Sequence, residues 1–119
     1  MNVATAIVIG LTATANIAIA VADLTRARFV LANTAEVQVP ASWLPRLAGL
    51  KGAGGLALLL WFASVPVLPV AAAAGLVCFF IGAITVHIRA HVFYNIAFPG
   101  AYLALAAASL ALLLHGTHA

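Results

Sequence analysis

Apolar residues run along this chain in long stretches that polar residues seldom interrupt. Residues 3–22 carry no charge, and a second uncharged run extends from Gly52 to Val86. About 20 apolar residues cross the ~30 Å hydrocarbon core of a bilayer, so the second run is too long for one crossing. Pro66 and Pro69 divide it. The pattern predicts membrane-spanning helices over residues 3–22, 44–63, 70–88 and 95–114, and we expect the first to be retained rather than cleaved as a signal.

The connections between these spans indicate the topology. Two of them are short, which favours neighbouring antiparallel helices, whereas residues 24–42 are longer and mix Phe29 and Val30 with Arg28 and Glu36. Such a segment is typical of a short helix lying in the membrane interface. We therefore predict an all-α protein: a single membrane domain over residues 1–119, built as an up-down four-helix bundle with an interfacial segment between the first two spans.

Composition supports the membrane assignment and excludes several functions. Hydrophobic residues make up 66% of the 119 residues and charged residues only 6%, against about 25% charged residues in soluble domains. No basic patch is interleaved with surface aromatics, so a nucleic-acid partner is not expected. Cys78 is the only cysteine, which excludes an internal disulfide and a Cys-x-x-Cys thiol relay.

The positive charges predict an orientation. All five lie in or beside the first and third connections: Arg26, Arg28, Arg46, Lys51 and Arg89. The positive-inside rule places those two connections in the cytoplasm and both termini outside. We expect a multi-pass protein of the cell (inner) membrane with nearly all of its ionisable groups at one face.

Polar and small residues recur at helical spacing, and each set predicts one face of a span. The sets are Thr5, Thr12, Asn16 and Asp23; Ala48, Gly52 and Gly55 around Lys51; Ala74, Cys78, Gly82, Thr85 and Arg89; and Asn95, Tyr102, Ala106 and Ser109. Because larger apolar side chains suit lipid, we expect these faces to point into the bundle. A plain alternative is that small residues only allow close helix packing.

Lys51 stands out among these residues. It follows Leu44 by seven positions, which places it roughly 10 Å into its span at 1.5 Å per residue. A lysine at such depth is costly unless it reaches the interface or finds a partner. Asp23 is the candidate partner, and Asn16 lies at a similar depth on the same span as Asp23.

The segment Gly82 to His91 raises the question of a histidine site. His87 and His91 are four residues apart and could share a metal ion, but no third ligand is evident, and we expect no metal site. Arg89 is turned about 200° from His87 on a helix. We therefore expect Arg89 on the inward face and the histidines elsewhere. His115 and His118, at the opposite end, are not expected to belong to a site.

The chain resembles the DoxX-like family of small four-helix membrane proteins over about residues 23–114. The most distinctive resemblance is the spacing of Pro40, Pro45, Lys51 and Gly54, together with the "HIRA" end of the third span. The resemblance implies a four-helix membrane bundle. It also implies a link to quinone- or thiol-associated redox complexes or to assembly of other membrane proteins. In the family an acidic residue often follows the His-Arg stretch, where this chain has His91.

These patterns favour a binding protein that holds a lipophilic molecule of quinone, isoprenoid or lipid type, as an accessory or redox-associated subunit. The candidate ligand-binding residues are Asn16, Asp23, Lys51, Arg89, Asn95 and Tyr102. One alternative is a membrane enzyme using acid–base chemistry, with Asp23, Glu36 and Lys51 as candidate catalytic residues. Another is an assembly or structural partner of another membrane protein, or a homo-oligomer. No motif identifies a cofactor.

Overall fold

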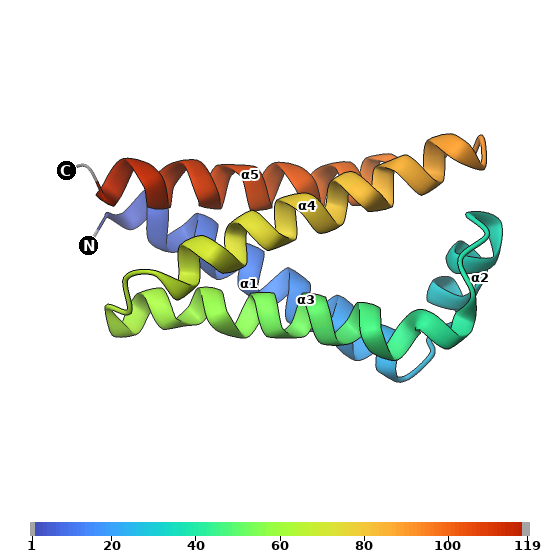
Figure 1. Ribbon diagram of the computed structural model, residues 1–119, viewed down its shortest axis with the longest axis horizontal. Helices are drawn as coiled ribbons and strands as arrows, with labels where there is room; N and C mark the ends of the chain where they lie inside the picture. The colour runs from blue at the N-terminus through green and yellow to red at the C-terminus, as the bar shows by residue number, and fades with distance from the viewer. Residues whose placement is uncertain (1, 118–119) are drawn as a thin grey trace.

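The computed structural model describes residues 2–117 and is all-α (Figure 1). Four long helices run side by side in up-down order: α1 (Val3–Leu24), α3 (Leu44–Leu59), α4 (Leu68–Arg89) and α5 (Ala97–Thr117). The short 3-10 helix η2 (Leu60–Ala63) extends α3, and the resulting four segments are long and apolar enough to cross a membrane. The bundle is 44 Å long, which matches a bilayer of about 40–45 Å with its headgroups. The predicted fold class is confirmed.

Helix α2 (Arg28–Glu36) lies across one end of the bundle, between α1 and α3 in sequence (Figure 1). A second 3-10 turn, η1 (Ala41–Trp43), leads from it into α3. Val30 of α2 packs with Ile19 and Leu44, which anchors the segment to α1 and α3. The short helix predicted within residues 24–42 is therefore present, and it lies at the end of the bundle that carries the charged residues.

Four helical segments end with a residue in the left-handed region. These residues are Arg26, Gln38, Ser64 and His91, with φ between 54° and 64°. At His91, the amide of Val92 donates to the His87 carbonyl at 2.9 Å and the amide of His91 donates to Ile88 at 3.0 Å. This pair of bonds is the Schellman motif that satisfies the last carbonyls of a helix. His91 therefore has a structural role at the helix end.

Glycines of α3 let neighbouring helices approach closely. A Cβ on Gly55 would lie 2.9 Å from the Ala13 carbonyl oxygen of α1, and one on Gly54 would lie 2.8 Å from Leu76 of α4. Helix α3 therefore allows close approach of α1 on one side and of α4 on another.

Helices α1 and α5 are joined by a polar contact, because the hydroxyl groups of Thr12 and Ser109 share a hydrogen bond of 2.8 Å.

The structure corrects one predicted face. On α1, Thr5, Thr12, Asn16 and Asp23 are buried as expected. The prediction for α4 is wrong for Cys78, Thr85 and Arg89, which are exposed, whereas Ala74 is half-buried and Gly82 borders a cavity at the α2 end. The buried residues of α4 are instead Pro69, Ala73, Leu76, Phe80 and His87.

The predicted face of α4 is wrong because the small residue at the contact with α3 belongs to α3 and the large one to α4. Leu76 fills the space that Gly54 leaves open, so the small residue stands on α3 and the large one on α4. Thr85 tolerates exposure because its hydroxyl donates to the Ile81 carbonyl at 2.7 Å within the same helix.

Candidate functional site

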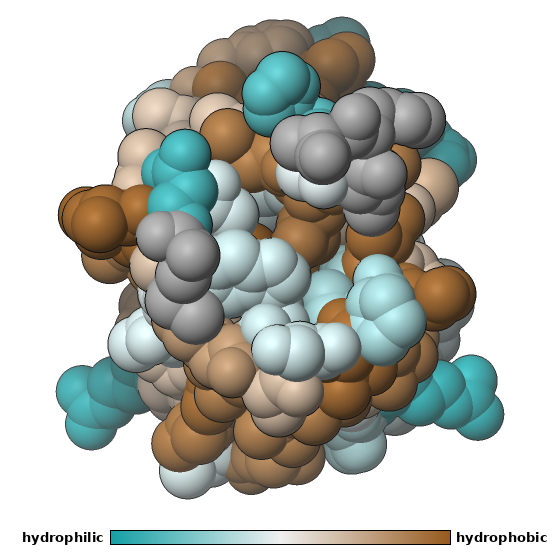
Figure 2. Space-filling model, turned by 90° about the vertical axis from the view of Figure 1, so that its left-hand side faces the viewer, coloured by the Kyte–Doolittle hydropathy of each residue, from teal (hydrophilic) through white to brown (hydrophobic). Residues whose placement is uncertain are grey.

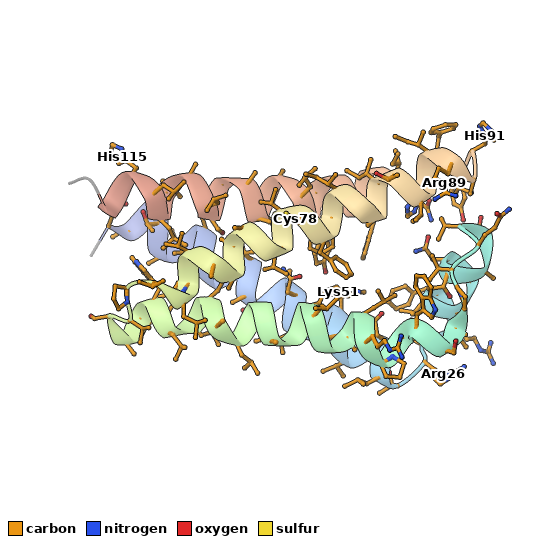
Figure 3. The ribbon with its side chains drawn as sticks, in the orientation of Figure 1. Arg26, Lys51, Cys78, Arg89, His91 and His115 are labelled. Atoms are coloured by element: carbon orange, nitrogen blue, oxygen red, sulfur yellow. The ribbon has the colours of Figure 1, made fainter. Side chains whose placement is uncertain are left out.

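A cavity of about 590 Å³ lies at the α2 end of the bundle. Its walls come from α2, the first half of α3, the second half of α4 and the start of α5, and α1 contributes Ile19 and Asp23. Figure 3 shows the Lys51 side chain pointing from α3 into the space between α3 and α4. The volume falls within the range of about 300–1,000 Å³ that is usual for small-molecule sites.

Most of the cavity wall is apolar and much of it is aromatic. The Tyr102 ring lies 5.2 Å from the Phe80 ring and 5.2 Å from the Phe98 ring, centroid to centroid. Further apolar lining residues are Ile19, Phe29, Val30, Val37, Val39, Trp43, Leu44, Leu47, Leu50, Phe79, Ala83, Val86 and Pro99. Such a wall is suited to rings and hydrocarbon chains rather than to ions.

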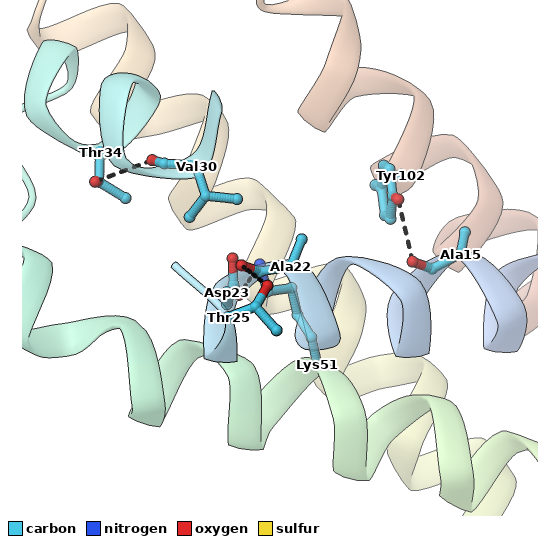
Figure 4. Close-up of polar contacts among 8 residues, drawn as sticks. All are labelled: Ala15, Ala22, Asp23, Thr25, Val30, Thr34, Lys51 and Tyr102. Atoms are coloured by element: carbon cyan, nitrogen blue, oxygen red, sulfur yellow. Dashed lines mark hydrogen bonds and ion pairs between the residues drawn. The ribbon is translucent and has the colours of Figure 1, made fainter. Parts of the chain in front are cut away.

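An ion pair is buried at the base of this apolar cavity. Lys51 Nζ lies 2.7 Å from Asp23 Oδ2, and the two residues are only 8% and 3% exposed (Figure 4). The ammonium also lies 5.4 Å from the centre of the Phe79 ring, within the reach of a cation–π contact. The pairing expected from the sequence is thus present. Burying two charges costs free energy even when they pair, which points to a role beyond stability.

His87 also borders the cavity and is 3% exposed. Its Nδ1 lies 2.8 Å from the Ala83 carbonyl oxygen, and a carbonyl can only accept, so Nδ1 carries a proton. In the neutral ring Nε2 is then the acceptor. That atom is buried and has no hydrogen-bond partner among the described residues.

Two hydrogen bonds join α2 to the connection between α4 and α5 at the cavity mouth. Tyr94 Oη donates to Glu36 Oε1 at 2.6 Å, and Asn95 Nδ2 donates to Asn33 Oδ1 at 3.2 Å. All four residues line the cavity. The hydrogen bond to the Glu36 carboxylate, followed by desolvation and by the charge of Glu36, raises the pKa of the exposed Tyr94 above its ordinary value of 10.0.

Asn16 lies deeper in the bundle than the cavity lining. It is fully buried, and its Nδ2 donates to the Thr12 carbonyl at 2.9 Å. Its Oδ1 is buried without a partner among the described residues. A Cβ on Gly55 would lie 3.4 Å from the Asn16 Cβ, so Asn16 faces α3 one helical turn beyond Lys51.

The structure brings together most of the residues that the sequence singled out. Asp23, Glu36, Lys51, Asn95 and Tyr102 line the cavity, and the Tyr102 hydroxyl donates to the Ala15 carbonyl at 3.1 Å (Figure 4). Asn16 lies beneath the lining.

Arg89, by contrast, is exposed and is not part of the lining, so its expected inward position is wrong. Sequence reasoning missed Tyr94 and Asn33, and it did not expect His87 on the inward face of α4. For His87 a signal existed, since it follows Phe80 by seven residues and Leu76 by eleven on one helical face.

A second hollow of about 460 Å³ lies at the opposite end, near the two termini (Figure 2). In that view pale, weakly polar residues gather around the centre of the face among apolar ones. The residues that line this second hollow are Asn2, Thr5, Trp61, Ser64, Val65, Pro66, Val70, Leu112, Leu113 and Gly116. None of these is charged. His115 is exposed at this end, and His118 lies outside the described residues.

A model of the DoxX-like family matches residues 7–109, which cover the cavity, all of α3 and α4 and most of α1 and α5. The chain belongs to the DoxX-like family. No match to it was found among curated proteins or among solved structures. This DoxX-like protein is thus a multi-span membrane protein whose four apolar helices contact lipid.

Proposed function

We propose that this DoxX-like protein binds a lipophilic small molecule of quinone, isoprenoid or lipid type in the α2-end cavity, as an accessory or redox-associated subunit. The observation that carries the proposal is the buried Lys51–Asp23 pair beneath an apolar, aromatic wall. Apolar walls with a few convergent polar groups are what a small-molecule site needs. The walls hold the ring or chain, and the base holds the polar head.

The roles of the two charged residues follow from their chemistry. The Lys51 ammonium has three N–H donors and lies 2.7 Å from Asp23 Oδ2 as an ion pair, so donors remain for a ligand oxygen. Asp23 keeps the ammonium charged and oriented within the apolar site. Lys51 is therefore the principal ligand-binding residue, and Asp23 positions it.

The orientation that we propose follows from the same end of the bundle. Arg26, Arg28, Arg46 and Arg89 all lie at or near the α2 end, on which Lys51 and both carboxylates also lie. The positive-inside rule then places the cavity at the cytoplasmic leaflet of the cell membrane and both termini outside.

A ligand panel tests the binding function. The purified protein in detergent is heated with and without a short-tailed quinone, a prenyl alcohol and a phospholipid, and the ligand-induced rise in Tm is compared with that of Lys51→Met. Arg46→Met is the matched control, because Arg46 is an exposed cation of α3 outside the cavity. We expect one ligand class to raise the Tm of the wild type and of Arg46→Met but not of Lys51→Met. No response in the wild type, or equal responses in all three proteins, contradicts the proposal.

An enzymatic role is the second candidate, supported by the titratable groups that meet in the cavity. Asp23, Glu36, Lys51 and His87 all line it, so acid–base chemistry on a lipophilic substrate has its residue types in place. Turnover by the purified protein that is lost in Asp23→Asn or Glu36→Gln would favour this role. Ligand binding without any product would argue against it.

An assembly role is the third candidate, supported by the exposed small residues of α4. Cys78 and Thr85 are exposed and lie outside the cavity lining, so they allow a helix of a partner or of a second copy to approach closely. Crosslinking through Cys78 in native membranes tests it, with a discrete crosslinked species expected. A monomer alone would contradict this role.

A further inference from the structure

We infer that the ligand of the α2-end cavity carries a hydrogen-bond donor at its polar head, as a lipophilic alcohol or phenol does. The inference rests on the proposed binding function and specifies the chemical class of the ligand. Its basis is the character of the buried polar atoms that lack a partner among the described residues.

His87 supplies the first of these atoms. The bond of Nδ1 to the Ala83 carbonyl at 2.8 Å fixes the proton on Nδ1, so the neutral ring offers a lone pair at Nε2. A buried acceptor without a donor is costly. Because His87 borders the cavity, a hydroxyl group of a bound molecule is the donor that this position can recruit.

Asn95 and Asn16 each also have a buried acceptor atom without a donor among the described residues. Asn95 uses its Nδ2 on Asn33 and leaves Oδ1 buried without a partner, and Asn95 borders the cavity. Asn16 uses its Nδ2 on Thr12 and also leaves Oδ1 without a partner, one helical turn beyond Lys51. All three buried atoms of His87, Asn95 and Asn16 are thus acceptors.

The charged pair at the base of the cavity does not change this excess of hydrogen-bond acceptors. Asp23 is a further acceptor, and Lys51 is the donor opposite it. A hydroxyl group both accepts and donates, so it can take a hydrogen bond from Lys51 and give one to an acceptor such as His87 Nε2. A quinone carbonyl, an ether or a phosphate diester can only accept, and would leave His87 Nε2 and Asn95 Oδ1, the acceptors of the cavity lining, unsatisfied.

Two ligands that differ only in the donor test the inference: a long-chain 4-alkylphenol and its methyl ether. Titration calorimetry with the full-length protein in nanodiscs measures both affinities. We expect the phenol to bind at least about tenfold more tightly, the factor that one unsatisfied buried acceptor implies. We expect His87→Phe, which cannot accept, to reduce this preference, and His87→Gln, which can, to retain it. His91→Phe is the control, because His91 is exposed at the end of α4.

The outcomes separate the inference from the function on which it rests. Equal affinities of phenol and ether for the wild type overturn the inference and leave the binding function standing. An undiminished preference in His87→Phe overturns the role of His87. If neither compound nor any member of the quinone, prenyl and phospholipid panel binds, the binding function itself fails.

Discussion

Lys51 Nζ lies 2.7 Å from Asp23 Oδ2, and this contact links the middle of α3 to the last turn of α1. Both residues are at least nine-tenths buried. The pair lies where two helices pack closely and where the cavity has its base. One contact therefore bears on both the stability of the bundle and the recognition of a ligand.

The first prediction concerns this ion pair. Lys51→Met leaves a buried carboxylate and Asp23→Asn leaves a buried ammonium, so each change alone is expected to cost about 3–5 kcal/mol of unfolding free energy. The double variant removes both charges and is expected to regain most of that loss. Denaturant unfolding in detergent measures the unfolding free energy of the wild type, the two single variants and the double variant. Additive losses in the double variant would show that the two charges do not interact.

The second prediction concerns the contact of α3 with α1. Gly55→Ala places a Cβ 2.9 Å from the Ala13 carbonyl oxygen, so the helices must move apart, at a cost of about 1–3 kcal/mol. Gly49→Ala is the matched control on the same helix, since its Cβ would meet nothing within 4 Å. Thermal unfolding should show a lower Tm for Gly55→Ala and an unchanged or higher one for Gly49→Ala. Equal Tm values would argue against this close approach.

The third prediction concerns the hydrogen bond between Tyr94 and Glu36. Because this bond raises the pKa of Tyr94 above 10.0, the folded protein holds the phenolic proton more tightly than the unfolded chain does. The stabilising contribution is therefore complete below pH 10 and is lost as pH rises through the folded pKa.

Ultraviolet absorbance of tyrosinate measures that pKa in a Tyr102→Phe background, in which Tyr94 is the only tyrosine. Adding Glu36→Gln should shift the midpoint of the titration downward, toward the ordinary value. A midpoint that does not move would mean that Glu36 does not accept this hydrogen bond.

The fourth prediction concerns His91, whose φ of 57° is costly for a residue with a Cβ. His91→Gly should relieve that cost and raise the unfolding free energy by up to about 1 kcal/mol, and His91→Val should lower it. Calorimetric Tm values test both changes. If glycine lowers the Tm, then His91 contributes contacts that outweigh its backbone strain.

The sequence predicted the architecture because a bilayer restricts it severely. Long apolar runs and the Pro66–Pro69 break predicted four spans, and the depth of Lys51 in its span called for a partner such as Asp23. The orientation of α4 was missed because small residues were assumed to face inward. Gly54 shows why that assumption fails, since the space it opens on α3 is filled by Leu76 of α4.

The cavity itself was harder to predict than the spans. Its mouth depends on how α2 folds across the bundle and brings Glu36 and Asn33 to Tyr94 and Asn95. Those pairs are separated by 58 and 62 residues, and helical periodicity carries no information about such contacts. His87 was expected away from the inward face, although its spacing from Leu76 and Phe80 places it on the buried face of α4.

The central claim is that the α2-end cavity holds a lipophilic ligand, and contact quenching of tryptophan fluorescence tests it most directly. Trp43 lines this cavity and Trp61 lines the hollow at the other end. They are the only tryptophans, so Trp61→Phe and Trp43→Phe isolate one each. Titration with a brominated 4-alkylphenol should quench Trp43 saturably and leave Trp61 with only the weak, linear quenching of probe dissolved in detergent. Equal linear quenching of both, or saturable quenching of Trp61 alone, would contradict the account.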